Sequence, residues 1–126
     1  MNYLAHSYLS FTDEQIVGQF LEDFIPNRDR FSYSEKLQEG ITLHREIDTF
    51  TDAHHSISEA KKIYSPMVRL YSGAFVDVSL DYFLANSLSG LELKNHAEKV
   101  YRALRKYDNI LPEKLKKMVN GMEKDN

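Results

Sequence analysis

The chain has 126 residues, 42% of them hydrophobic and 28% charged, which is ordinary for one soluble globular domain spanning residues 1–126. It contains no cysteine, which excludes disulfides and thiolate metal sites, so any metal must be held by histidine and carboxylate. No apolar run approaches the roughly 18–20 residues needed to cross a bilayer, and the first residues lack a secretory signal pattern. We therefore expect a cytoplasmic protein that does not span a membrane.

The net charge of −3 is unevenly distributed along the chain. Residues 1–93 carry 7 Lys and Arg against 14 Asp and Glu, whereas residues 94–126 carry 9 against 5. This asymmetry predicts an acidic region able to hold cations and a basic region able to meet an anionic partner, although two solvated helix faces explain it equally well. Nucleic acid is disfavoured as that partner because the whole chain is acidic and no known reader motif is present.

The first helices are predicted from their start signals. A turn or two of helix is expected around His6. Thr12 and Gln15 have the spacing of a capping box, which predicts a helix running from there to about Ile25. Asp23 borders the apolar face of that helix, where a carboxylate is either a boundary residue or part of a drier functional site.

The densest group of chemically active residues lies within positions 40–55, which hold three of the five histidines. On a helix His44 and Asp48 are four residues apart, as are Asp48 and Asp52, so the members of each pair lie on one face. Imidazole and carboxylate at that spacing can hold one divalent ion. The stretch also includes His54. Taken alone, one His/Asp pair favours a salt-bridged amphipathic helix over a metal site.

Other signals place the neighbouring helix boundaries. A capping box beginning at Ser32 is expected to open the helix of the central stretch, and Gly40 within it indicates close approach of another backbone. A further box at Ser56 predicts a short helix. Ser65 and Pro66 then read as the N-cap and first residue of the next helix.

Residues 66–88 form the most apolar segment, which predicts a central helix buried nearly all round. Asp77 and Asp81 lie four apart within it, and two buried carboxylates require a cation, an arginine or a shared proton. Residues 93–107 and 113–122 are predicted to form two amphipathic helices. No strand pattern occurs, so the expected class is all-α, a helical bundle.

Four segments in order combine these acids and histidines with a characteristic apolar context, and they resemble acyl carrier protein phosphodiesterases. They are Asn2-Tyr3-Leu4-Ala5-His6, Gly18-Gln19-Phe20-Leu21-Glu22-Asp23-Phe24, Leu43-His44-Arg45-Glu46-Ile47-Asp48-Thr49-Phe50-Thr51-Asp52-Ala53-His54 and Val76-Asp77-Val78-Ser79-Leu80-Asp81-Tyr82-Phe83-Leu84-Ala85. The third segment is the most specific. The resemblance implies a fold like that of HD-type metal-dependent phosphohydrolases and removal of 4′-phosphopantetheine from holo acyl carrier protein.

The resemblance also implies a divalent metal, with Mn²⁺ the first choice and Mg²⁺, Fe²⁺ or Zn²⁺ as alternatives. The implied ligands or water-activating residues are His6, Asp23, His44, Asp48 and Asp77. Arg45 is the catalytic candidate for phosphate binding. The secondary candidates are Asp52, His54 and Asp81, together with Arg69 as a weaker phosphate-binding candidate. The acidic carrier protein is expected to dock on the basic region from Lys94 to Lys117.

The chain also departs from the family pattern. Tyr82 stands where several relatives have histidine, Leu88 stands where they often have tryptophan, and residues 89–126 match only loosely. Family members usually continue with further helices, so we expect C-terminal helices of the family to be lacking here and a second copy of the chain to cover the exposed face. Two other functions are compatible with the sequence: an HD-like phosphohydrolase of a small phosphoester or nucleotide, and an inactive helical module that binds a partner.

Overall fold

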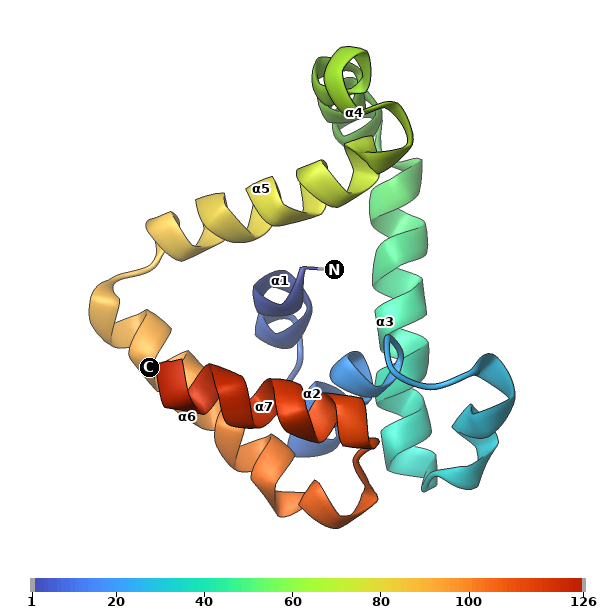
Figure 1. Ribbon diagram of the computed structural model, residues 1–126, viewed down its shortest axis with the longest axis vertical. Coiled ribbons are helices and arrows are strands. Elements are labelled where there is room, and N and C mark those ends of the chain that lie inside the picture. The colour runs from blue at the N-terminus through green and yellow to red at the C-terminus, as the bar shows by residue number, and fades with distance from the viewer. Residues whose placement is uncertain (1, 126) are drawn as a thin grey trace.

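The computed structural model describes residues 2–125, and within that range the chain forms helices and no strand (Figure 1). The α-helices are α1 (Tyr3–Tyr8), α2 (Asp13–Leu21), α3 (Glu35–Ala53), α4 (His55–Val68), α5 (Ser72–Ser87), α6 (Gly90–Lys106) and α7 (Glu113–Asp125). Short 3-10 helices span Asn27–Ser32, Arg69–Tyr71 and Asp108–Ile110. The predicted all-α class is confirmed. Among the described residues, no helix combines the length and apolar character required to cross a membrane.

The helices form an open frame around the short first helix. Figure 1 shows α3 along the long axis, α5 leading from α4 back towards α6, and α1 in the space that α3, α5 and α6 enclose. Helix α1 packs against α2 and α5, while α2 also packs against α3 and α6. The side chain of His6 on α1 also meets that of Asp48 on α3, far along the chain.

The hydrophobic core lies at one end of this frame, where α2 is surrounded by α3, α6 and α7. Its buried side chains are Ile16, Val17, Phe20, Leu21, Leu37, Ile41, Val100, Ala103, Leu104, Leu111, Leu115 and Val119. Every residue of α2 from Ile16 to Leu21 is buried, so α2 is the central helix of the protein. Residues at the edge of this core are held rigidly, which is the setting that a preorganised site requires.

Two glycines bring α2 and α3 into backbone contact. A Cβ atom built on Gly18 would lie 2.5 Å from the Cα atom of Gly40, and one built on Gly40 would lie 2.7 Å from the carbonyl oxygen of Glu14. The expectation that Gly40 marks close approach of another backbone is confirmed. Because Gln19 follows Gly18 and His44 lies one turn after Gly40, this contact also sets the position of both side chains.

Local start signals predicted some helix boundaries and missed others. The Thr12 capping box is confirmed, with both reciprocal hydrogen bonds present. The predicted start at Ser32 is wrong: that residue ends a 3-10 helix, and the side chain of Ser34 caps α3 by accepting from the backbone N–H of Leu37.

The apolar segment after α4 differs most from its prediction. Pro66 lies inside α4 instead of opening a new helix, so the helix continues with the loss of one backbone donor. Helix α5 packs on α4 and α1, which cover only part of its circumference, and Val76 is its one buried residue. The prediction of a helix buried nearly all round is therefore wrong. The exposed large apolar residues of this region are Ile63, Met67, Leu70, Tyr71, Phe75, Val78, Tyr82 and Phe83.

Candidate metal centre

The position of His6 is set by a contact between distant parts of the chain. Helix α1 has only six residues, and its own N-cap residue Asn2 makes no side-chain cap. The Asp81 carboxylate on α5 caps it instead, accepting from the backbone N–H of Leu4 at 3.1 Å and of Ala5 at 2.9 Å. A carboxylate at a helix N-terminus is stabilised by the helix dipole and by unpaired N–H groups. Asp81 therefore anchors the helix that carries His6.

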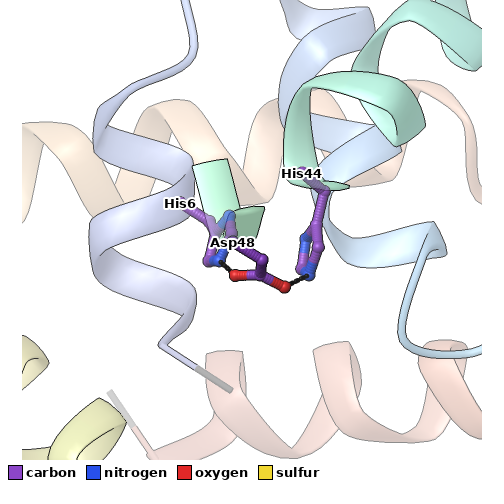
Figure 2. A group of neighbouring side chains, drawn as sticks. All are labelled: His6, His44 and Asp48. Atoms are coloured by element: carbon purple, nitrogen blue, oxygen red, sulfur yellow. Dashed lines mark hydrogen bonds and ion pairs between the residues drawn. The ribbon is translucent and has the colours of Figure 1, made fainter. Parts of the chain in front are cut away.

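Three of the predicted site residues converge between α1, which carries His6, and α3, which carries His44 and Asp48 (Figure 2). His6 Nε2 lies 3.0 Å from Oδ1 of Asp48, and His44 Nε2 lies 3.3 Å from its Oδ2. The two imidazole rings stack with their centroids 3.9 Å apart. Each residue offers one ligand atom, and these atoms all lie within 4.8 Å of one another. Both histidines are buried while the Asp48 side chain is 49% exposed, so the group opens to solvent on the aspartate side.

Gln19 contacts both histidines on the side of each ring opposite Asp48. Its side-chain Oε1 lies 2.7 Å from Nδ1 of His6, and its backbone carbonyl oxygen lies 2.8 Å from Nδ1 of His44. Both oxygens can only accept, so each Nδ1 carries the proton and donates it. In a neutral ring the lone pair then sits on Nε2, which is the atom that faces Asp48.

This arrangement brings acceptors together. Two Nε2 lone pairs face two carboxylate oxygens of Asp48, and in the neutral rings no hydrogen lies between them. The contacts are favourable only when a proton is added to each Nε2 or when a cation is shared by all three side chains. Two imidazoles and a carboxylate suit Mn²⁺, Fe²⁺ or Zn²⁺, and a ligand histidine whose other N–H is bonded to a protein oxygen is the usual arrangement at metal sites.

The pKa values of the group reflect this competition. Burial by itself lowers the pKa of His44, but the hydrogen bond that its imidazole donates to Asp48 and the charges of Asp23 and Asp48 outweigh burial and raise that pKa above its ordinary value. Burial raises the pKa of Asp48, but its bonds to His44 and His6 outweigh that effect and hold the pKa well below the usual range. Without metal, these contacts thus favour the ionised form of Asp48 and shift the equilibrium of His44 towards its protonated form.

Asp23 borders this group on the side of His44. Its Oδ1 lies 3.7 Å from His44 Nε2, and its side chain is 19% exposed. Burial raises the pKa of Asp23, which makes it a stronger base than an ordinary aspartate. Burial and the charge of Asp23 also raise the pKa of Tyr3 to about 12, so Tyr3 remains a neutral phenol near this carboxylate.

The remaining predicted residues lie elsewhere. Asp52 and Asp77 line a separate cavity of about 230 Å³ between α3, α4 and α5, together with Lys61. His54 is the N-cap of α4 and accepts from the backbone N–H of Ser56. The Asp77 carboxylate is therefore outside the group formed by His6, His44 and Asp48.

The two arginines differ in their surroundings. Arg45 Nε donates to Oε1 of Glu22 at 2.8 Å, and its Nη2 donates to Oδ1 of Asn27. The side chain of Arg45 stays 36% exposed, within reach of solvent. Arg69 occupies the exposed turn between α4 and α5, with a φ of 45° that is rare for a residue other than glycine.

Gln19 is the residue of this site that sequence reasoning overlooked. The one signal in the sequence was a glutamine on the apolar face of α2, between Gly18 and Phe20. A polar side chain at an otherwise buried position requires a partner, and here that partner is His6. The identity of such a partner depends on tertiary packing.

Comparison with known proteins identifies relatives of the chain. The sequence model of a family described as acyl carrier protein phosphodiesterase matches residues 1–126. Proteins of that description from Pectobacterium atrosepticum and Yersinia pestis are 34% and 35% identical over 86 residues, covering 68% of this chain and 45% of each relative. One from Klebsiella pneumoniae is 30% identical over 122 residues, covering 95% of this chain and 63% of the relative. The chain thus spans about half to two thirds of the length of these relatives. No solved structure matches it.

Proposed function

Because the chain belongs to the acyl carrier protein phosphodiesterase family, we propose that it hydrolyses the phosphodiester that joins 4′-phosphopantetheine to a serine of holo acyl carrier protein. The observation that carries this proposal is the convergence of potential metal-ligand atoms from His6, His44 and Asp48. The rings of both histidines are held in place by contacts between their Nδ1 atoms and oxygens of Gln19. A divalent ion bound there lowers the pKa of water and neutralises phosphate oxygens, which is the chemistry that phosphodiester hydrolysis requires.

The protein's own residues would then act as follows. His6, His44 and Asp48 hold the ion, Mn²⁺ by first choice. Asp23, whose pKa is raised, takes the proton of the attacking water at its carboxylate. The new bond joins the water oxygen to phosphorus, the bond from phosphorus to the serine oxygen breaks, and a proton passes to that oxygen. The products are 4′-phosphopantetheine and the apo carrier protein. Arg45 is the candidate for binding phosphate oxygens.

The cysteine-free composition favours the cytoplasm as the location of the protein.

The direct test is the intact mass of holo acyl carrier protein after incubation with the protein and Mn²⁺. We expect loss of the phosphopantetheine mass with Mn²⁺ and no loss with EDTA. Hydrolysis of a small phosphodiester or a nucleotide while the carrier protein stays intact would favour the small-substrate phosphohydrolase. Carrier binding without any hydrolysis would favour the inactive partner-binding module, which is the remaining alternative.

Metal binding should reverse the pH dependence of stability. In EDTA, the raised pKa of His44 means that its contribution to the free energy of unfolding is complete below about pH 6.5 and is lost as pH rises through the folded-state pKa. Mn²⁺ must displace that proton, so the increase in melting temperature caused by Mn²⁺ should grow as pH rises from 5.5 to 8.5. Thermal unfolding at several pH values, with Mn²⁺ and with EDTA, measures the pH dependence of stability and the increase in melting temperature caused by Mn²⁺. An Mn²⁺ effect that is larger at pH 5.5 than at pH 8.5 contradicts this assignment.

We propose that the carrier protein docks on the basic region from Lys94 to Lys117, which covers α6 and the start of α7. Part of this charge is neutralised within the protein, because Lys106 pairs with Asp13 and Arg105 with Glu123. The exposed lysines Lys114 and Lys117 are therefore the better probes.

Replacing both Lys114 and Lys117 with glutamate should raise KM for the carrier protein by about 10-fold at low salt and leave kcat unchanged, because rim charges act mainly on association. Steady-state kinetics at two salt concentrations measure the effect. The matched control replaces exposed Lys36 and Lys62 on α3 and α4 with glutamate. An equal rise in KM for both double variants contradicts docking at this region.

We also propose that the exposed apolar face of α4 and α5 pairs with a second copy of the chain. Large apolar side chains exposed in such number are typical of an interaction site, and a two-fold contact pairs the same surface of both copies. Light scattering at micromolar concentration should give the mass of a dimer. Replacing Val78 and Phe83 with lysine should give a monomer with unchanged helix content. A wild-type monomer at that concentration contradicts the proposal.

A further inference from the structure

One buried residue contacts both histidines of the proposed metal centre through two different oxygen atoms. Gln19 is 1% exposed, its side-chain Oε1 accepts from Nδ1 of His6, and its backbone carbonyl accepts from Nδ1 of His44. These bonds, 2.7 Å and 2.8 Å long, are short enough to be well formed. The backbone contact does not depend on the identity of residue 19, whereas the side-chain contact does.

We infer that Gln19 is a positioning residue that fixes both histidines in the tautomer needed for metal binding. When the rings are neutral and each Nδ1 donates to an oxygen of Gln19, each Nε2 keeps its lone pair and points at Asp48. A histidine in the other tautomer would carry hydrogen on Nε2 and could not bind an ion there. The inference rests on the proposed metal site for its consequence, but the tautomer itself is a property of the metal-free protein.

The surroundings of the Gln19 amide support this role. Its Nε2 atom is buried and has no hydrogen-bond partner. A buried unpaired donor destabilises the folded state, so packing alone would favour an apolar side chain of the same size. The benefit of glutamine at this position is the acceptor oxygen that it presents to His6.

The stack of the two rings adds a second constraint. The ring planes are nearly parallel, at 10°, with centroids 3.9 Å apart, so a rotation of one imidazole would disturb the other. Gln19 fixes each ring from the side opposite Asp48. Two ligand atoms are thereby held side by side on neighbouring rings before any ion arrives, which lowers the entropy lost when an ion binds.

The experiment compares Gln19→Met with Gln19→Glu. Methionine has a similar volume and removes both the acceptor and the unpaired donor, while glutamate keeps an acceptor oxygen. Long-range ¹H–¹⁵N correlation spectra in EDTA, at a pH where both rings are neutral, report the tautomer of each histidine. In wild type we expect hydrogen on Nδ1 of both rings. In Gln19→Met we expect His6 to lose this preference and His44 to keep it, because the backbone carbonyl remains.

Calorimetric titration with Mn²⁺ gives the second readout. Gln19→Met should weaken Mn²⁺ binding by about 10–100-fold, the usual effect of removing a partner behind a metal ligand, and Gln19→Glu should restore it to near the wild-type affinity. Gln38→Met is the matched control, because Gln38 donates to the Tyr33 carbonyl and does not contact either histidine. The retained His44 signal shows that Gln19→Met is folded around the site.

Two results would overturn the inference. One is wild-type His6 with its hydrogen on Nε2, which corresponds to the opposite orientation of the Gln19 amide. The other is a folded Gln19→Met that keeps the wild-type tautomer of His6 and the wild-type Mn²⁺ affinity. If wild type binds no Mn²⁺ while both histidines show the expected tautomer, the proposed metal function fails and the positioning role of Gln19 stands.

Discussion

Asp48→Asn is expected to weaken Mn²⁺ binding by about 100-fold or more and to abolish hydrolysis of holo acyl carrier protein. Asparagine has the shape of aspartate but lacks the negative charge that the cation needs. Its amide also donates a hydrogen bond towards a lone pair on Nε2 of His6 or His44, so the site is satisfied without an ion. Calorimetry and the intact-mass assay measure the two effects.

The control for this variant is Glu46→Gln, which makes the same change of charge at an exposed position two residues earlier on α3. We expect wild-type Mn²⁺ affinity and activity for it. Circular dichroism and thermal unfolding should show that Asp48→Asn is folded in EDTA. If that variant binds Mn²⁺ with wild-type affinity, the ion is held by other residues and the proposed centre is wrong.

Gly40→Ala is expected to reduce the free energy of unfolding by about 3 kcal/mol, because the added methyl group overpacks the contact between two helices. The new Cβ would lie 2.7 Å and 2.9 Å from the carbonyl oxygens of Glu14 and Gln15, and 2.9 Å from the Cα atom of Gly18. All three are backbone atoms, which cannot move aside like the end of a flexible side chain. Helices α2 and α3 must therefore separate, and a loss of this size lowers the melting temperature by about 10 °C.

Gly121→Ala is the matched control because a Cβ on that residue of α7 meets no atom within 4 Å. Alanine is the better helix former, so this variant should gain about 1 kcal/mol. Separation of α2 from α3 also moves Gln19 away from His44, so Gly40→Ala should bind Mn²⁺ more weakly even at temperatures where it is folded. Denaturant titration of both variants gives the sign of each change in the free energy of unfolding. A Gly40→Ala protein as stable as wild type contradicts the close contact.

Local signals in the sequence predicted the local parts of this structure. The capping box of Thr12 and Gln15 needs only residues three apart, and it was predicted correctly. The same holds for His44 and Asp48, which lie on one face of α3 at the spacing that their positions require. Helical periodicity also sufficed for the all-α class.

Features that depend on packing between distant segments could not be predicted from the sequence. Asp77 and Asp81 share one helix face, but they have separate partners. Asp81 caps α1 by accepting from residues that precede it by 77 and 76 positions, whereas Asp77 lines the cavity between α3, α4 and α5. Hydropathy shows that α5 is apolar without showing which neighbours cover it, so the prediction of burial failed. Gln19 was missed for a similar reason, because its two partners come from α1 and α3.

The most direct test of the central claim is an anomalous diffraction measurement on crystals grown with Mn²⁺. We predict one strong manganese peak at coordination distance, roughly 2.0–2.3 Å, from Nε2 of His6, Nε2 of His44 and an oxygen of Asp48. A peak in the cavity of Asp52 and Asp77, or no peak in crystals where the three side chains converge as described, would contradict the claim that these residues form the metal centre.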